Sequence, residues 1–425
     1  MVLAWAFVTA SDEFLSEDLL AMRTQALAKM DEQPFTYKVE LQRNYNSSQV
    51  LRVVAGTYDT PNFLSEPDKN TSRLVRGADD LPALQNIGTA KLGALVPKCV
   101  ETAELPLPVT IFGHGIFGNA RDALENDFLQ TLADEQCTVV AGGDWIGLSD
   151  QEIAAVAYAM HDINRGAALT NKLSQAVVNF IVLQRMLRGP MLTADAFMYE
   201  GEQILDPTRV SYFGASLGGI MGGVLMAIDP DMTRGALGVP GGPWSLLFER
   251  TVFWPPLRIT MKGAYLNPWD YQQNVALLGM LFEPVDPIST AHRVLSDPLP
   301  GTPSKQLLVY IALGDALVSN IASDVLARTL ALPVIGPSVA VPFGLTMATE
   351  PVSSGYTIYD ESPDLLPPDH NALEDLTYND THQDVHEWGS VQRQVFRLLT
   401  EGVVESECNL QGAPAPCLCS TGACQ

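Results

Sequence analysis

The chain has 425 residues, of which 25 are basic and 49 acidic, giving a formal net charge of −24. This negative charge repels phosphate backbones and anionic lipid head groups, so nucleic acid is not an expected partner. With 47% apolar and 17% charged residues, the composition is that of a globular protein rather than a disordered one. The length allows one large domain with an insertion, or two ordinary domains.

The first 90 residues are expected to form an extension that packs on a larger core. The opening run MVLAWAFVTA has no basic segment before it and is too short to span a bilayer, so we interpret it as a buried strand. An export signal is then expected to precede this sequence in a longer precursor. Apolar spacing predicts an amphipathic helix over 14–30, a strand at 50–56, and a loop over 62–90.

From residue 91 the sequence alternates between short apolar runs bounded by Gly and Pro and helical stretches. This alternation is typical of a parallel sheet covered by helices, so the predicted fold class is α/β with a doubly wound, mostly parallel sheet over 91–402. The predicted strands are LGALVPKC, LPVTIFG, CTVVAGG, VSYFGAS, RGALGVPG, LLVYIALG and GYTIY. The predicted helices span 119–135, 151–188, 217–228, 317–331 and 390–401.

The segment 243–303 interrupts this alternation and is rich in aromatic residues, Leu, Met and Pro. We interpret it as a helical lid or cap over the carboxyl edge of the sheet, where ligands bind in such folds. A core-packing excursion or a dimer surface stays open as the alternative, and the oligomeric state cannot be read from the sequence. No transmembrane span is predicted. The expected pocket-forming residues of the cap are Trp244, Phe248, Phe253, Trp254 and Trp269.

Six cysteines are unevenly distributed. Cys99 and Cys137 lie in the body of the chain, and the tail 403–425 contains Cys408, Cys417, Cys419 and Cys424. The tail has too few large apolar residues to form a core, so covalent links are expected to order it. Its spacing lacks the paired C-x2-C of zinc sites, which favours disulfides over a thiolate metal site. Disulfides predict an extracytoplasmic protein that is secreted, periplasmic or surface-attached.

The strongest chemical motif is Gly214-x-Ser216-x-Gly218, because a predicted strand ends in it and a predicted helix begins directly after it. This strand-turn-helix context is that of a nucleophile elbow. The turn is so sharp that side chains at 214 and 218 would collide with neighbouring backbone. Ser216 is therefore the predicted nucleophile, and the amide of Leu217 at the helix N-terminus is placed to stabilise an oxyanion.

A second motif, Gly113-His114-Gly115-Ile116-Phe117-Gly118, directly follows the strand LPVTIF. It resembles the oxyanion loop of lipases and esterases, and by that match Ile116 and Leu217 supply the two amide donors. His114 is expected to hold the loop by hydrogen bonds rather than to act as a base.

The predicted acid is Asp315, which follows a late strand as a carboxylate that orients an imidazole should. Asp286, before Pro287, is the alternative acid, but no strand precedes it, and a helix-capping or turn role is the simpler explanation. The predicted base is His382, just ahead of the last helix. His386 and His370 stay open as alternatives, and the i, i+4 spacing of His382 and His386 also permits a metal site as a minority interpretation.

The chain order Ser216, Asp315, His382 resembles that of the α/β-hydrolases, and most closely bacterial secreted esterase and lipase-like proteins. The resemblance covers about residues 91 to 402. It implies a serine hydrolase that cleaves a small-molecule or lipid ester through an acyl-enzyme intermediate and needs no cofactor. An acyltransferase, a peptidase or a polyester depolymerase would use the same triad, and a non-catalytic binding module would share the fold.

Overall fold

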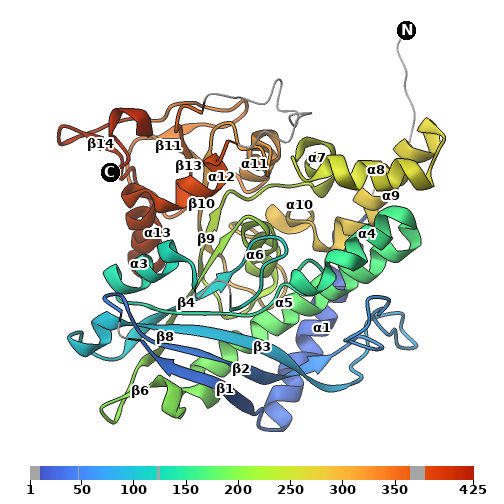
Figure 1. The fold of residues 1–425 in the computed structure, drawn as a ribbon, viewed down its shortest axis with the longest axis horizontal. Helices are drawn as coiled ribbons and strands as arrows, with labels where there is room; N and C mark the ends of the chain where they lie inside the picture. The colour runs from blue at the N-terminus through green and yellow to red at the C-terminus, as the bar shows by residue number, and fades with distance from the viewer. Residues whose placement is uncertain (1–9, 46, 122–124, 364–378) are drawn as a thin grey trace.

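The computed structural model describes residues 10–45, 47–121, 125–363 and 379–425. Its centre is an eleven-stranded sheet in the order β1-β2-β3-β5-β4-β8-β9-β10-β13-β11-β12 (Figure 1). Two apolar core clusters occupy its two faces. One is formed with α1, α4, α5, α6 and the helices of the segment 243–303, and the other with α3, α13 and the C-terminal tail. Helices on both faces confirm the predicted doubly wound α/β class.

The parallel part of the sheet runs from β5 to β12. Its strands are β4 (Leu107–Gly113), β5 (Val139–Gly142), β8 (Leu205–Ala215), β9 (Arg234–Gly238), β10 (Gln306–Ala312), β11 (Val334–Ile335), β12 (Met347–Ala348) and β13 (Gly355–Tyr359). From β4 the chain crosses to β5 on one side and later returns to β8 on the other, so β4 and β8 flank a topological switch point. Ligands of such sheets bind beyond the carboxyl ends of the strands at this place.

Three antiparallel strands extend the sheet on the other side: β1 (Tyr37–Asn44), β2 (Val50–Asn62) and β3 (Asn86–Pro97). The run LGALVPKC lies in β3, so its predicted parallel pairing was wrong. The reason is topological, because loops rather than a helical crossover join β1, β2 and β3. Most of the predicted loop at 62–90 is irregular, although β3 already begins at Asn86. The run MVLAWAFVTA lies outside the described residues except for its last position.

The helix α1 (Asp12–Glu32) confirms that residues 14–30 are helical, and Ser11 caps it by accepting a hydrogen bond from the Phe14 amide. Its Arg23 guanidinium is buried and donates to the carbonyls of Ile228 and Pro300, 2.8 and 2.6 Å away. These bonds tie the N-terminal helix to elements more than two hundred residues further along the chain.

The helices that cover the parallel strands largely follow the predicted pattern. They are α3 (Asp127–Glu135), α4 (Ile153–His161), α5 (Gly166–Arg188), α6 (Leu217–Ile228), α11 (Asn320–Thr329), α12 (Thr381–Asp384) and α13 (Gly389–Glu401). The single helix predicted over 151–188 is divided into α4 and α5, because Asp162 leaves the helical conformation and caps a short 3-10 turn. The helix predicted to begin at 317 begins at Asn320.

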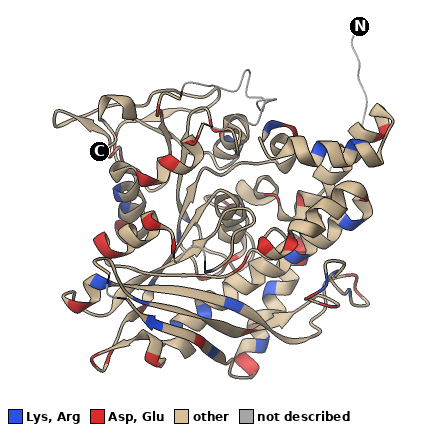
Figure 2. Cartoon of the chain, in the orientation of Figure 1, with Lys and Arg blue, Asp and Glu red and all other residues tan. Residues whose placement is uncertain are grey.

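Between β9 and β10 the chain forms α7 (Trp244–Leu247), α8 (Trp254–Ala264), α9 (Pro268–Phe282) and α10 (Pro287–Ala291). In Figure 1 α8 lies beside α4, away from the C-terminal tail, and α9 contacts α5 and α7. The segment is helical, as predicted. Among the described helices, none combines the length and apolarity that a bilayer crossing requires. Asp and Glu are spread over many elements rather than gathered in one run (Figure 2).

Three disulfides are present: Cys99–Cys137, Cys408–Cys417 and Cys419–Cys424. The two tail disulfides, Cys408–Cys417 and Cys419–Cys424, confirm the disulfides predicted for this region. Around them are the two-residue strands β14 (Asn409–Leu410) and β15 (Ala413–Pro414), and a similar small hairpin, β6 (Met198–Tyr199) with β7 (Glu202–Gln203), lies before β8. The tail packs against β13 and α13, where the Cys417 carbonyl accepts from the Asp360 amide and the Cys424 carbonyl accepts from Ser390.

Candidate active site

Ser216 lies in the turn between β8 and α6, in a backbone conformation that L-residues rarely adopt, with φ 57° and ψ −120°. Such conformations persist only where the surroundings impose them, and they concentrate at functional sites. A Cβ atom at Gly214 would overlap the backbone of Gly218, and one at Gly218 would overlap the backbone of Gly113. These overlaps confirm the prediction that side chains at 214 and 218 would collide with neighbouring backbone. The Ser216 amide is held by the Gly238 carbonyl at 2.9 Å.

The loop after β4 lies directly against this turn. Gly113 pairs in register with Gly214, and a Cβ atom on Gly115 would lie 3.7 Å from the Ser216 Cβ. Both ring nitrogens of His114 are engaged in the loop: Nε2 accepts from the Trp145 amide at 2.8 Å, and Nδ1 lies 2.7 Å from the Gly115 carbonyl. His114 therefore has the loop-holding role predicted for it.

The two expected oxyanion donors come from the elements that meet here. Ile116 belongs to the loop after β4, and Leu217 is the first residue of α6. Amides in the first turn of a helix have no carbonyl partner within that helix, and the helix dipole places partial positive charge there. Both residues line the same cavity as Ser216.

Asp315 and His382 form a buried pair beside this turn. His382 Nδ1 lies 2.6 Å from Asp315 Oδ2, and each side chain is only 1% exposed. The other carboxylate oxygen, Oδ1, accepts from the amides of Leu317 and Val318 at 2.8 and 2.9 Å. Hydrogen bonds therefore hold both carboxylate oxygens of Asp315 in place. Among the described residues, His382 Nε2 has no hydrogen-bond partner, although it is buried. His382 and Ser216 line one cavity.

The sequence did not single out Asn320, which holds the loop that carries Asp315. Its Oδ1 accepts from the Gly314 amide at 2.8 Å, and its Nδ2 donates to the Ala312 carbonyl at 2.8 Å. Asn is common at turns, and no motif separated this one from other asparagines.

His386 occupies a different environment from His382. Its Nδ1 lies 2.7 Å from the Tyr310 hydroxyl rather than a carboxylate, and its ring stacks on Phe128 with centroids 5.3 Å apart. Burial, followed by the nearby His382, lowers the pKa of His386 to about 3, so the ring is neutral at physiological pH. His370, the other alternative base, lies outside the described residues.

The two histidines do not point to a metal site. Within the described ranges, no group of three or more His, Cys, Asp or Glu side chains is arranged to hold a metal ion. His382 and His386 each direct one ring nitrogen to a separate partner, Asp315 and Tyr310.

Asp286, the alternative acid, is occupied by the cap segment. Its Oδ2 accepts from the Trp244 amide at 2.7 Å, and its Oδ1 accepts from the Ile288 amide at 3.0 Å at the start of α10. This is the helix-capping role that the sequence offered as the simpler explanation. Burial raises the pKa of the Asp286 carboxyl to about 7.

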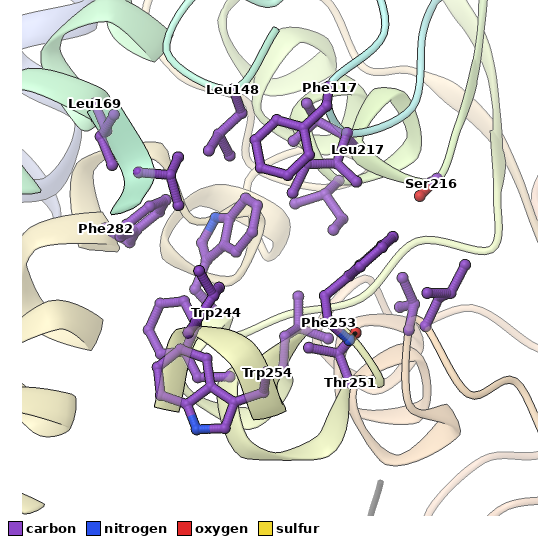
Figure 3. Close-up of a pocket in the computed structure, with 18 of the residues that line it drawn as sticks. Phe117, Leu148, Leu169, Ser216, Leu217, Trp244, Thr251, Phe253, Trp254 and Phe282 are labelled. Carbon is purple, nitrogen blue, oxygen red and sulfur yellow. Dashed lines mark hydrogen bonds between the residues drawn. The ribbon is translucent and has the colours of Figure 1, made fainter. Parts of the chain in front are cut away.

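Two cavities meet at Ser216. The first, of about 230 Å³, includes side chains of the segment 243–303 in its wall and is lined almost entirely by apolar side chains (Figure 3). The second, of about 200 Å³, contains His382 and several polar side chains. Trp244, Phe248, Phe253 and Trp254 line the first cavity, as predicted. Trp269 does not, since it lies on the outer face of α9 with 78% of its surface exposed, so that prediction was wrong.

Comparison with known proteins gives structural matches of low sequence identity. No family model matches the chain, and no curated protein matches it in sequence. Among solved structures, acetyl xylan esterase 1 from Thermoanaerobacterium sp. JW/SL YS485 is 16% identical with a TM-score of 0.48, covering 91% of this chain and 94% of that chain. An acetyl xylan esterase from Paenibacillus sp. R4 is 15% identical with a TM-score of 0.46, covering 84% and 90%. The esterase LipA from Xanthomonas oryzae is 13% identical with a TM-score of 0.44, covering 86% and 97%.

The fold itself is that of the α/β-hydrolases. The sheet places a sharp strand-turn-helix serine at the carboxyl end of a central parallel strand, and an Asp and a His follow it in chain order after later strands.

Proposed function

We propose that this chain is a serine hydrolase that cleaves carboxylic esters through an acyl-enzyme intermediate, with Ser216 as nucleophile, His382 as base and Asp315 as the orienting acid. The proposal depends on the hydrogen bonding of the two ring nitrogens of His382. Its Nδ1 is fixed on a buried carboxylate, while its buried Nε2 lacks a protein partner in the described chain and shares a cavity with Ser216. An imidazole held in this way is prepared to accept a proton.

In the first half of the reaction, the Ser216 oxygen bonds to the ester carbonyl carbon while its proton passes to His382 Nε2. The amides of Ile116 and Leu217 hydrogen-bond the oxyanion, each contributing about 3 kcal/mol to the stability of the transition state. The bond between the carbonyl carbon and the alcohol oxygen then breaks. The leaving oxygen takes the proton from His382 and departs as the alcohol.

In the second half, a water molecule gives a proton to His382 as its oxygen bonds to the acyl carbon. The bond to Ser216 breaks, the serine oxygen recovers the proton, and the carboxylic acid is released. Throughout, Asp315 keeps the remaining imidazole proton on Nδ1 and stabilises the imidazolium. No cofactor enters these steps.

We further propose the domain arrangement that suits this reaction. Residues 243–303 act as a cap on the hydrolase domain 91–402, residues 1–90 are an extension of it, and 403–425 are a disulfide-bonded tail. The three disulfides support an extracytoplasmic location, since such bonds persist in oxidising compartments.

A fluorophosphonate probe tests the assignment of Ser216. We expect the folded protein to be labelled at Ser216 and Ser216→Ala to be unlabelled, with kcat for p-nitrophenyl esters lowered by about 10⁴-fold or more. Ser211→Ala is the matched control, because Ser211 lies on the same strand but is buried within the sheet. It should keep both labelling and turnover. Absence of label on folded wild-type protein would rule the proposal out.

A further inference from the structure

Ser216 lies where an almost wholly apolar cavity joins a second cavity whose lining is mixed, polar and apolar. Only Ile116, Ser216, Phe253 and Leu317 line both of them among the described residues. In the apolar cavity, Ser216 and Thr251 are the lining residues with a hydroxyl group, and Figure 3 shows aromatic rings around the space with Ser216 at one end. We call the second one the polar cavity because, besides apolar side chains such as Phe112 and Phe128, it is lined by the polar residues His114, Asn126, His382, Gln383 and His386.

The position of His382 determines which part of an ester each cavity receives. This step rests on the proposed function, in which His382 Nε2 gives its proton to the leaving alcohol oxygen. The alcohol must therefore leave on the side where His382 lies. His382 lines only the polar cavity, whereas Leu217, an expected oxyanion donor, lines only the apolar one. From this geometry we propose that the apolar cavity binds the acyl group and the polar cavity binds a hydrophilic alcohol.

The walls of the apolar cavity limit the size of the acyl group. Its inner wall consists of buried side chains that belong to the molecule's main core: Trp244, Leu247, Phe248, Trp254, Leu278 and Phe282. An apolar cavity of about 150 Å³ accommodates benzene, and this one measures about 230 Å³. The fitting acyl groups are therefore unbranched chains of about six to eight carbons, or an aromatic ring carried on a short chain. An acetyl group would leave most of the cavity unfilled, and a long fatty chain would meet its inner wall.

The polar cavity suits an alcohol with further hydroxyl groups. Asn126 and Gln383 lie at its exposed rim and carry amide groups that can both donate and accept hydrogen bonds. His386 lines the same cavity as a neutral ring held by Tyr310. Glycerol-like or sugar-like alcohols match these groups, whereas a long alkyl alcohol would have to remove them from water without replacing their hydrogen bonds. The substrate class is thus an ester of a medium-sized apolar acid with a hydrophilic alcohol.

The acyl assignment is tested with p-nitrophenyl esters from acetate to palmitate, which vary only the acyl group. We expect kcat/KM to peak at hexanoate or octanoate, about tenfold or more above both acetate and palmitate. Leu257→Trp adds bulk to the cavity wall and should lower the octanoate-to-acetate ratio about tenfold. Ile259→Trp is the matched control on the same helix, because Ile259 is 74% exposed and outside the cavity lining; its ratio should equal that of the wild type. Phe282→Leu, which enlarges the cavity, should shift the peak to longer chains.

The alcohol assignment is tested by holding the acyl group at octanoyl and comparing the glycerol monoester with the decyl ester. We expect the glycerol ester to be cleaved with about tenfold higher kcat/KM. A peak at acetate or palmitate, an unchanged ratio in Leu257→Trp, or preference for the decyl ester would overturn the assignment while leaving Ser216 labelled and active. Failure of the proposed function is a separate result, in which no ester is cleaved and Ser216 is not labelled.

Discussion

At the scale of single residues, the two neighbouring histidines differ in what holds them. His382 is bound to a carboxylate and has a nitrogen that lacks a partner within the described chain, whereas His386 is bound to a tyrosine hydroxyl and packs on a phenylalanine ring. The arrangement of His382 favours accepting a proton, and that of His386 favours a permanently neutral ring. Substituting the two histidines should therefore affect activity and stability differently.

We expect His382→Ala to lower kcat/KM by about 10³-fold or more, because the base is removed. His386→Ala should lower it by less than about tenfold but reduce stability by about 1–3 kcal/mol, because the buried Tyr310 hydroxyl loses its partner. Ester hydrolysis and thermal unfolding of both variants provide the measurements. Equal losses of activity, or a greater loss in His386→Ala, would contradict the assignment of the base.

Much of the site could be predicted at this scale, because its residues are marked by local chemistry. Gly214 and Gly218 identify Ser216 through a turn that only glycine fits, and this is visible in five consecutive letters. His382 was separated from His386 and His370 only by its place before the last helix. No local pattern indicates which histidine contacts Asp315, because His382 and Asp315 are 67 residues apart in the sequence.

At the scale of elements, Asp286 joins two parts of the segment 243–303, because its carboxyl group is buried at the start of α10 and accepts from the amides of Trp244 and Ile288. In the unfolded chain this group ionises near its ordinary pKa of 3.8, whereas burial raises the pKa of the folded group to about 7. The folded protein therefore keeps a proton that the unfolded chain has lost between these values. The stability that this proton provides is fully present below pH 3.8 and is lost as the pH rises through about 7.

Asp286→Asn removes this titration while keeping an oxygen that can accept the amide of Ile288. We expect the melting temperature of the wild type to fall relative to that of Asp286→Asn as the pH rises from about 4 to about 7. Comparing the two proteins at each pH cancels the contributions of other titrating groups. Melting curves recorded across this range provide the test, and two parallel profiles would show that Asp286 is ionised in the folded state.

The sequence also predicted most of the elements, and its errors have physical causes. An apolar run in β3 has the same composition whether its neighbour is parallel or antiparallel, so LGALVPKC gave no sign of its pairing. Trp269 was expected in the pocket because it belongs to the aromatic-rich segment 243–303, but it lies on the outward face of α9. The division of the helix at Asp162 required a capping contact that helical periodicity does not reveal.

At the scale of the whole molecule, the disulfides differ in the length of chain that they close. Cys99–Cys137 joins positions 38 residues apart and links the segment after β3 to the end of α3. Cys419–Cys424 joins positions only 5 residues apart within the tail. A disulfide limits the freedom of the unfolded chain, and this effect grows with the length of the closed loop.

We therefore expect the double variant Cys99→Ser/Cys137→Ser to lose about 4 kcal/mol of unfolding free energy, and Cys419→Ser/Cys424→Ser about 2 kcal/mol, from loop length alone. Denaturant unfolding without reducing agent measures both. A larger loss for the tail pair would mean that its contacts with β13 and α13 outweigh the effect of loop length.

The meeting of two unlike cavities at one serine also affects how turnover ends. Under the proposed assignment, the acyl group enters as part of a neutral ester and finishes as an anion whose tail is surrounded by hydrocarbon side chains. The carboxylate of this product forms at Ser216, close to the buried pair of His382 and the Asp315 carboxylate, and repulsion between the two negative charges weakens the binding of the product. The liberated acid should thus be a poor inhibitor compared with an uncharged amide or ketone of equal length, and hydrolysis should continue undiminished while acid accumulates outside.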